Sequence, residues 1–549
     1  MRCKENIYLS SVVLAFQQYF SDGNFMKSKK TRFLVLSCLV ILFTFSHADD
    51  ESLQYGENQK PDTLDPYTSN ETTSLRISQL IFNSLVGIND KQEIVPELAL
   101  SWEISNNATE YTFRLRNDVS WHPYNGIKHK LTAKDVAKTV SIIKHPKTQS
   151  NRKTMFDHIA KIDMIDENTI RFTLEKKGLN DIARFNFKIL PAHLFTEIPY
   201  LNKSNSFAHN PIGTGPYLYT ETSDKQKIVL TANPDYYLGE PKLKNISLKP
   251  FADINVMNTA LSFNALDMII NVSPRYIADL KADKRFSLTP VNTLSYSFFA
   301  YNNNNPHLAK QKVRKALSLA LNREQMLKAF FGNRGTIISG PFPPGSWAYN
   351  LDVIPDQYDP EKSKILLMEA GYKRKNDQYF SDNQGKTLSF KLKVAIEKNN
   401  ESTKRVILAY KNFLKKIGVK VNVDFMEREA WRKAVFKEHD FDITLTSWSF
   451  DDASDITTLF HSRFNGPWEN NFISFNNAKI DSLLESGSAT LDFEEKRTIN
   501  HEIHKLLAEE SPYTFLWSLL NYTVYNKKFK DITIHPYKTF DNVQLWRSE

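Results

Sequence analysis

The sequence predicts a mixed α/β protein, and three features of the chain support this prediction. From Tyr301 onward, apolar stripes at helical spacing alternate with short segments in which polar and apolar residues alternate as in strands. Before that point the strand patterns come mainly as hairpins, with turns near 166–168 and 223–224. The length of 549 residues, with 41% apolar and 12% aromatic residues, is sufficient for two or three compact domains.

The first 48 residues have the pattern of an export signal. An apolar run at 33–45 is followed by Ser46-His47-Ala48, a cleavage site of small residues around a histidine. The run is preceded by Lys27, Lys29, Lys30 and Arg32. We expect translation to start at Met26, residues 1–25 to be an upstream extension, and cleavage to follow Ala48. The apolar run is too short to persist as a membrane-spanning helix.

Cysteine content and charge limit the classes of function. Both cysteines, Cys3 and Cys38, lie in the expected leader, so the mature chain has no disulfide and no thiol nucleophile. Lipid attachment at Cys38 is not expected, because only five residues separate it from Arg32. The net charge of +9 is small beside 71 basic and 62 acidic residues, and the two signs are interspersed. This balance argues against a nucleic-acid partner.

In the first half of the chain, local signals predict several elements. Apolar spacing predicts a helix from Leu75 to Leu85, ended by Gly87, and alternation predicts a strand at 111–115. Thr132 and Asp135 form a capping pair before a helix. The run Gly213-Thr214-Gly215-Pro216 lacks the lysine and the following helix of a phosphate loop, and therefore indicates a turn into a strand.

In the second half, capping residues mark successive helices. Val313 to Leu321 is one helical stripe, and Asn322 caps the next helix, which ends at Gly332. Asp359 and Pro360 begin a helix that ends at Gly371. Further along come a helix closed by Gly418, a strand at 419–425, a short helix at 430–436 and a strand from Phe441. This order predicts parallel strands joined by crossovers.

The stretch 441–455 is the principal candidate site. Its strand ends at Trp448, and Asp451, Asp452 and Asp455 follow with no basic residue before Arg463. Ligands of open α/β sheets lie beyond the carboxyl ends of the strands. An aromatic residue and carboxylates at such an end suit a cationic group. A core tryptophan and a solvated acidic turn are the alternatives.

Other motifs give weaker indications of chemistry. No serine nucleophile motif is present, and no carboxylate pair is placed at the separation that glycoside hydrolysis needs. His501 and His504 share a helix face, where a solvated surface is favoured over a metal site. His122 and His129 fall in an expected surface loop. We therefore expect no catalytic residue, no metal and no cofactor.

Several runs in a fixed order resemble the bacterial extracellular solute-binding proteins of family 5, the group that binds dipeptides and oligopeptides for ATP-driven importers. The resemblance covers most of the mature chain. The runs are Ile94-Val95-Pro96-Glu97-Leu98-Ala99, Ser101-Trp102, Tyr111-Thr112-Phe113-Arg114-Leu115-Arg116, Leu131-Thr132-Ala133-Lys134-Asp135-Val136, Gly213-Thr214-Gly215-Pro216-Tyr217, Val313-Arg314-Lys315-Ala316-Leu317, Ala320-Leu321-Asn322-Arg323-Glu324 and Lys416-Ile417-Gly418-Val419.

The resemblance also implies roles for residues at the candidate site. In peptide-binding members an aspartate three residues after the tryptophan receives the α-ammonium of the ligand, which implies that role for Asp451. Residues beside the tryptophan line the peptide main chain, which implies Ser447 and Ser449. Arg463 is the nearest basic residue for the ligand carboxylate. The chain departs from the family pattern at Ser447, where a glycine is common, and at Ile456, where a proline is usual after the acidic residues.

The fold implied by the resemblance is a two-lobed periplasmic binding protein of cluster C type, with a hinge crossed twice and an extra sub-domain in the first lobe. We expect lobe I at 49–292, lobe II at 293–517 and a return to lobe I at 518–549. The segments Tyr296 to Tyr301 and Trp517 to Tyr525 are the expected crossings. Closure of the lobes would bury the ligand.

The function implied is that of a monomeric periplasmic component of an ABC transporter, which binds small peptides and delivers them to an inner-membrane permease. Other members of the family take nickel chelates, haem, opines or sugars, so a non-peptide solute is an alternative. A second alternative is an extracytoplasmic hydrolase that uses the acidic residues, and a third is a receptor-like or chaperone role for the same cleft.

Overall fold

The computed structural model describes residues 51–549, except 70, 91, 106–108, 151, 176–181, 198, 225–226, 375–378, 396–400, 451–454, 491 and 537. The expected leader and Asp451 and Asp452 therefore lie outside the described residues. Within them, the largest sheet has twelve strands, ten of which follow in the order β16-β15-β17-β13-β18-β11-β1-β10-β9-β8, while β12 and β14 also pair with β18. Helices and strands mix as the sequence predicts, which confirms the α/β class.

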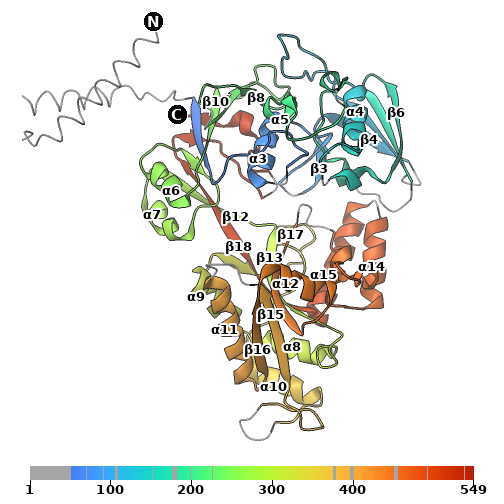
Figure 1. Ribbon diagram of the computed structural model, residues 1–549, viewed down its shortest axis with the longest axis vertical. Helices are drawn as coiled ribbons and strands as arrows, with labels where there is room; N and C mark the ends of the chain where they lie inside the picture. The colour runs from blue at the N-terminus through green and yellow to red at the C-terminus, as the bar shows by residue number, and fades with distance from the viewer. Residues whose placement is uncertain are drawn as a thin grey trace, which may run out of the picture. The chain divides into compact units, whose positions relative to one another are not determined.

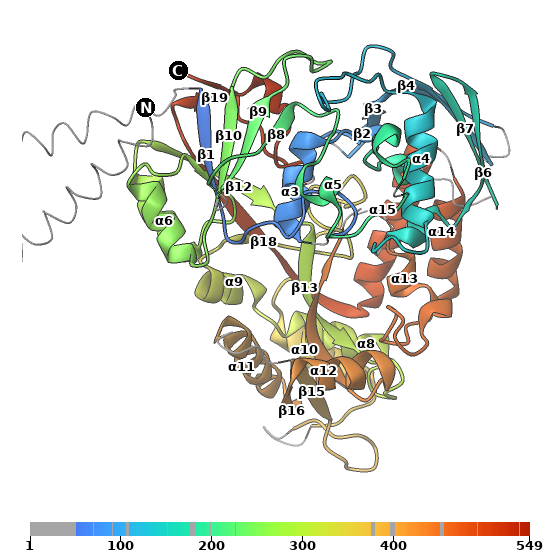
Figure 2. The ribbon, with the colours of Figure 1, turned by 45° about the horizontal axis from the view of Figure 1, so that its top comes forward.

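The first half of the chain builds one end of this sheet and a smaller sheet. Figure 2 shows β1, β10, β9 and β8 side by side. The strands of this end are β1 (Ser52–Glu57), β8 (Tyr217–Thr220), β9 (Ile228–Ala232), β10 (Asn245–Pro250) and β11 (Met268–Ile269). A four-stranded sheet contains β4 (Ala99–Ile104), β5 (Glu110–Leu115), β6 (Ile159–Asp166) and β7 (Thr169–Leu174), and β2 (Val86–Ile88) pairs with β3 (Ile94–Pro96). The helices are α3 (Thr72–Ile81), α4 (Ala133–Lys144), α5 (Ser206–His209), α6 (Ile254–Ser262) and α7 (Ile277–Ala282).

The second half supplies the other end of the sheet. As predicted, β15 pairs in parallel with both β16 and β17, while β13 pairs antiparallel with β17 and β18. The strands are β12 (Phe286–Asn292), β13 (Ser295–Tyr301), β14 (Gly335–Ile337), β15 (Ser389–Ala395), β16 (Lys420–Met426), β17 (Ile443–Ser449) and β18 (Tyr513–Asn526), followed by a small pair of β19 (Phe529–Lys530) and β20 (Arg547–Ser548). The helices are α8 (Gln311–Leu319), α9 (Arg323–Phe331), α10 (Pro360–Glu369), α11 (Glu401–Lys416), α12 (Arg428–Arg432), α13 (Thr457–Phe460), α14 (Ala478–Ala489) and α15 (Phe493–Glu510).

Most of the predicted helix ends are confirmed. Thr132 and Asp135 form a capping box at α4, and the side chain of Asn322 accepts a hydrogen bond from the Gln325 N–H at the start of α9. Asp359 caps α10 in the same way, through the Lys362 N–H. These ends are set by neighbours in sequence, which is why the pattern alone locates them.

The predicted end of helix α3 is wrong. The sequence predicts that it ends at Gly87, but it ends at Ile81, and Gly87 lies in β2. The Ile81 carbonyl accepts a hydrogen bond of 2.8 Å from the Gly215 N–H, so a distant turn supplies a partner for the helix end. A Cβ atom on Gly213 would lie 1.8 Å from the same carbonyl oxygen, so a side chain cannot fit there. The run 213–216 is thus a turn into β8, as predicted.

The predicted surface position of His122 is also wrong. It is not a surface residue, because its side chain is buried inside this turn. Its Nδ1 accepts a hydrogen bond from the Gly213 N–H at 3.3 Å, and its Nε2 lies 2.9 Å from the Gly215 carbonyl oxygen. Burial lowers the pKa of His122 from its ordinary value of 6.5 to about 4. A neutral imidazole with its proton on Nε2 satisfies both contacts.

This burial predicts a loss of stability in mild acid. The unfolded chain takes up a proton at His122 once the pH falls below 6.5, whereas the folded protein does so only near pH 4. The stabilisation is therefore complete above pH 6.5 and is lost as the pH falls towards 4, by at most about 1.4 kcal/mol per pH unit. Urea unfolding at pH 7 and pH 5 measures this loss. A His122→Asn variant should show a smaller loss, and an identical pH dependence in the variant would contradict the assignment.

Two apolar cores lie on opposite faces of the part of the sheet that the second half of the chain builds. Phe299, Tyr301 and Ile443 belong to the core that contains α8 and α11, which we call core A. Tyr296, Phe298 and Phe515 belong to the core on the other face, beside α12 and α15, which we call core B. Strand β18 also reaches a cluster around α6 and α7 through Val524. Figure 1 shows β18 running beside β12.

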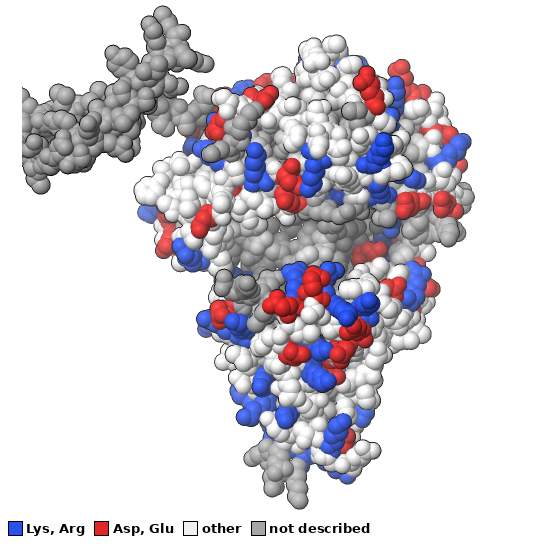
Figure 3. Space-filling view, viewed as in Figure 1, with Lys and Arg blue, Asp and Glu red and all other residues white. Residues whose placement is uncertain are grey.

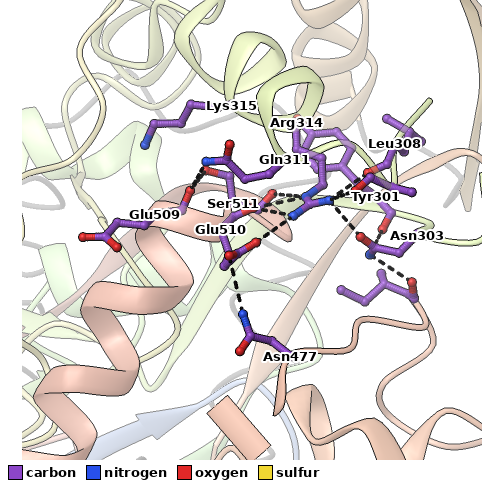
Figure 4. Close-up of polar contacts among 12 residues, drawn as sticks. Tyr301, Asn303, Leu308, Gln311, Arg314, Lys315, Asn477, Glu509, Glu510 and Ser511 are labelled. Atoms are coloured by element: carbon purple, nitrogen blue, oxygen red, sulfur yellow. Dashed lines mark hydrogen bonds and ion pairs between the residues drawn. The ribbon is translucent and has the colours of Figure 1, made fainter. Parts of the chain in front are cut away.

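Arg314 anchors the beginning of β18. Its buried guanidinium donates hydrogen bonds to the carbonyls of Glu510 and Ser511 at the end of α15, and to Asn303 and Leu308 (Figure 4). Burial lowers the pKa of Arg314 to about 10, which leaves it charged at neutral pH. The side chain therefore satisfies carbonyls at the helix end and fixes the point at which β18 starts.

Candidate functional site

The candidate strand is β17, which runs from Ile443 to Ser449 beside β13. The two strands pair antiparallel, and the last three residues of β17 lie opposite Ser297, Tyr296 and Ser295 in that order. The predicted strand is thus present, although it begins two residues after Phe441 and includes Trp448 and Ser449. Successive side chains of a strand point to opposite faces of the sheet, so this register decides what each face presents.

Trp448 lies on the core B face. Its indole is partly buried, and its Nε1 atom lies 3.4 Å from the Tyr513 hydroxyl, to which it donates. Aromatic rings surround the indole, with centroid distances of 6.2 Å to Phe298, 6.0 Å to Phe472 and 6.4 Å to Phe436. Burial raises the pKa of Tyr513, so its hydroxyl stays neutral. Trp448 is therefore held from one side by the core, while part of its surface remains accessible.

Ser447 and Ser449 lie on the opposite face, where both are exposed. The Ser447 hydroxyl forms a hydrogen bond of 2.9 Å with the hydroxyl of Ser297 on β13. The predicted site residues therefore share one strand but divide between its two faces. Ser297 is a residue that the sequence analysis did not nominate, and the alternation in Ser295-Tyr296-Ser297-Phe298 is the signal that could have identified its face.

One edge of β17 is unpaired at this end among the strands that the structure describes. Strand β15 pairs with β17 only at Ile443 and Thr444, so the ladder on that side stops before Leu445. On the other side, β13 pairs with β17 up to Ser449. In an antiparallel pair, alternate residues point their N–H and C=O groups away from the partner. Residues 445–449 therefore offer a short row of backbone donors and acceptors.

The acidic residues after β17 are only partly described. Asp451 and Asp452 lie outside the described residues, so their predicted roles stay predictions. Asp455 is exposed, and its carboxylate accepts a hydrogen bond of 2.9 Å from the Thr457 N–H at the start of α13. This contact is part of a local turn and gives Asp455 a partner within its own segment.

Arg463 is exposed in a short 3-10 helix, Ser462–Phe464. Its guanidinium lies 4.6 Å from the ring centroid of Phe464. None of the hydrogen bonds, ion pairs or ring contacts found among the described residues joins it to β17. The structure thus does not bring Arg463 together with Ser447 and Trp448.

His504 does not lie on a solvated helix face, contrary to the sequence interpretation. It is fully buried, with Nε2 2.8 Å from the Ser339 hydroxyl and Nδ1 accepting from the Asn350 N–H. Burial lowers its pKa to about 3. His501 instead contacts the Trp347 carbonyl through Nε2, so the two rings have different partners. Within the described part of the chain, no cluster of three or more His, Cys, Asp or Glu could hold a metal ion.

The visible surface carries mixed charge. Figure 3 shows basic and acidic side chains interspersed over this face of the molecule. On this face the two signs are interspersed, as they are along the sequence. Of the helices that the structure describes, none is both long enough and apolar enough to cross a membrane.

Comparison with known proteins gives relatives along most of the chain. The oligopeptide-binding protein AppA of Bacillus subtilis is 26% identical over 550 residues, with 95% of this chain and 99% of AppA covered. Its structure with a nonapeptide matches with a TM-score of 0.66, over 91% of this chain and 99% of that one. Heme-binding protein A of Haemophilus influenzae is 27% identical over 456 residues, with 79% and 81% covered. The family model of the bacterial extracellular solute-binding proteins, family 5, matches residues 93–470, and this chain therefore belongs to that family.

Proposed function

We propose that this protein is the periplasmic substrate-binding component of an ABC importer and that it binds di- or oligopeptides. The observation that carries the proposal is the edge of β17 at 445–449, which no strand of the described residues pairs with on that side, with Trp448 on one face and exposed serines on the other. An extended peptide can add to such an edge as a further strand through its main chain, whatever its side chains are. In this mode the main chain supplies the affinity, and the residues on each face decide any preference among side chains.

The proposed lobes are 49–292 with 518–549, and 293–517. Support for this division comes from the separate cores and from β18, which contributes side chains to cores A and B and to the cluster around α6. Closure about the strands that connect the lobes would bury the peptide. We propose that the closed protein, as a monomer, then delivers the peptide to an inner-membrane permease and that it breaks no bond.

Asp451 is the proposed acceptor of the peptide ammonium group. It follows Trp448 by three residues, just beyond the end of β17, which is where the family pattern has this aspartate. A charge-assisted hydrogen bond of this kind is worth about 1.5 to 3 kcal/mol. Arg463 is the proposed partner of the ligand carboxylate, and it would have to approach the peptide when the protein closes.

A non-peptide solute is the second candidate, because Heme-binding protein A is a relative of similar identity. Haem iron is held by axial ligands such as His, Cys, Met or Tyr. The exposed side chains at the edge of β17 are those of Ser447 and Ser449, which are not such ligands. The chemistry of this edge therefore favours a peptide.

Native mass spectrometry of the protein purified from the periplasm tests the proposal. We expect co-purified peptides that are released intact on denaturation. A haem, a metal chelate or a sugar in their place would overturn the peptide assignment. Incubation with a defined peptide mixture checks the absence of catalysis, because shortened peptides would indicate a hydrolase.

A further inference from the structure

The ends of β13 and β17 form a two-stranded ribbon with four serines on one face. Ser295 lies opposite Ser449, and Ser297 lies opposite Ser447, so the hydroxyls come from two neighbouring cross-strand pairs. None of the four is buried. This group, which we call the serine face, continues the side of the sheet that carries core A, beyond the last core residues Phe299 and Leu445.

The serine face has unused hydrogen-bonding capacity and space. A hydroxyl can donate one hydrogen bond and accept two. Between Ser297 and Ser447, one hydroxyl donates to the other across 2.9 Å, which leaves one proton and further lone pairs. Serine side chains are short, so they leave room above the ribbon. Both properties suit a polar side chain that approaches from outside.

The other face of the same ribbon is aromatic. Tyr296 lies opposite Trp448, and the Tyr296 ring stacks on Phe450 with a centroid distance of 5.6 Å. Phe298 lies opposite Thr446 and stacks against Trp448. Tyr296 and Phe298 are buried, whereas Trp448 is only partly buried. The accessible parts of this face therefore belong to Trp448, Phe450 and Thr446, and the two aromatic side chains make most of it apolar.

A peptide that adds to the edge of β17 would present its side chains alternately to these two faces. The side-chain period of a strand is two residues, so neighbours along the peptide meet different chemistry. We infer that the site selects peptides in which hydrogen-bonding and apolar side chains alternate, and that Ser447 on β17, held by its hydrogen bond to Ser297 on the neighbouring strand, sets the polar half of this preference. The inference rests on the proposed function and narrows its substrate class.

Two tetrapeptides of equal composition test the inference, Gln-Leu-Gln-Leu and Leu-Gln-Leu-Gln. They have the same charge and length, but counted from the same position of the N-terminus they place opposite side chains on each face, because a shift of one residue exchanges the faces. Isothermal titration calorimetry should give dissociation constants that differ by about 10-fold. Equal affinity for both would overturn the inference and leave the proposed function intact. If neither tetrapeptide nor any peptide mixture binds, the proposed function fails, and the inference fails with it.

A double variant and a control variant test whether the serine face causes the difference in affinity between the two tetrapeptides. The double variant Ser297→Ala, Ser447→Ala should raise the dissociation constant of the tighter-binding tetrapeptide by about 5-fold. The dissociation constant of the weaker-binding tetrapeptide should change by less than about 2-fold. Ser389→Ala is the matched control, because it removes a hydroxyl at the start of β15 in the same sheet, and both affinities should stay unchanged. Circular dichroism and thermal unfolding confirm that the variants fold. An equal loss for both peptides would contradict the role of these serines.

Discussion

Asp451→Asn is expected to weaken the binding of peptides with a free N-terminus by roughly 10- to 100-fold, while N-acetylated peptides bind nearly as before. The substitution keeps the size of the side chain but removes its charge. An asparagine oxygen can still accept a hydrogen bond, so the loss is the attraction between opposite charges, which is at most the whole charge-assisted bond of about 1.5 to 3 kcal/mol and corresponds to this range of affinity. Calorimetric titration with one peptide in its free and acetylated forms measures the difference directly.

Asp455→Asn is the matched control for this prediction. Asp455 is exposed, and its Oδ1 atom accepts a hydrogen bond from the Thr457 N–H. An asparagine side chain keeps a carbonyl oxygen for the same bond. We expect a change of less than about 2-fold for either form of the peptide. If Asp451→Asn weakened the free and acetylated forms equally, Asp451 would not be the ammonium acceptor.

Arg76→Met is expected to lower the free energy of unfolding by about 3 to 5 kcal/mol. Arg76 and Glu57 are both buried, and two hydrogen bonds of 2.7 and 3.0 Å join the guanidinium to the carboxylate. The carboxylate also accepts hydrogen bonds from Tyr55 and Thr73. Without Arg76 it would remain buried without a cation, which accounts for the large cost. Urea unfolding at pH 7 measures the change.

Two further variants isolate the cause of that loss. Lys128→Met removes an exposed partner of Asp235 and should cost less than about 1 kcal/mol. The double variant Glu57→Gln, Arg76→Met removes both buried charges and should recover part of the stability. A loss below about 1 kcal/mol in Arg76→Met would show that water reaches the Glu57 carboxylate.

Elements governed by neighbours in sequence could be predicted from the sequence. Thr132, Asn322 and Asp359 each cap a helix within three residues, and the strand that contains Trp448 follows from its alternation. Parallel pairing of β15 with β16 and β17 follows from the order of helices and strands. These features depend on spacing, which a single sequence displays.

Features that depend on distant partners could not be predicted. The end of α3 is set by Gly215, and the burial of His504 is set by Ser339, 165 residues away. At the candidate site, Ser297 meets Ser447 across 150 residues. The sequence shows that each of these residues is polar, but the strand register and the packing decide what it contacts. The tryptophan and its separation from the neighbouring serines follow from the strand period, whereas the pairing of Ser447 with Ser297 could not be predicted.

Residues after β18 belong to a core that also contains residues of β1, and this has a consequence for how the chain reaches its folded state. Strand β18 begins at Tyr513, and Phe529, Phe540 and Trp546 complete the core that starts at Leu53. This core stays incomplete until these C-terminal residues have been synthesised, so the N-terminal segments cannot pack fully before then. Such long-range pairing predicts slow folding. It also leaves apolar surface exposed while the chain is incomplete, so the unfinished chain depends on protection from aggregation.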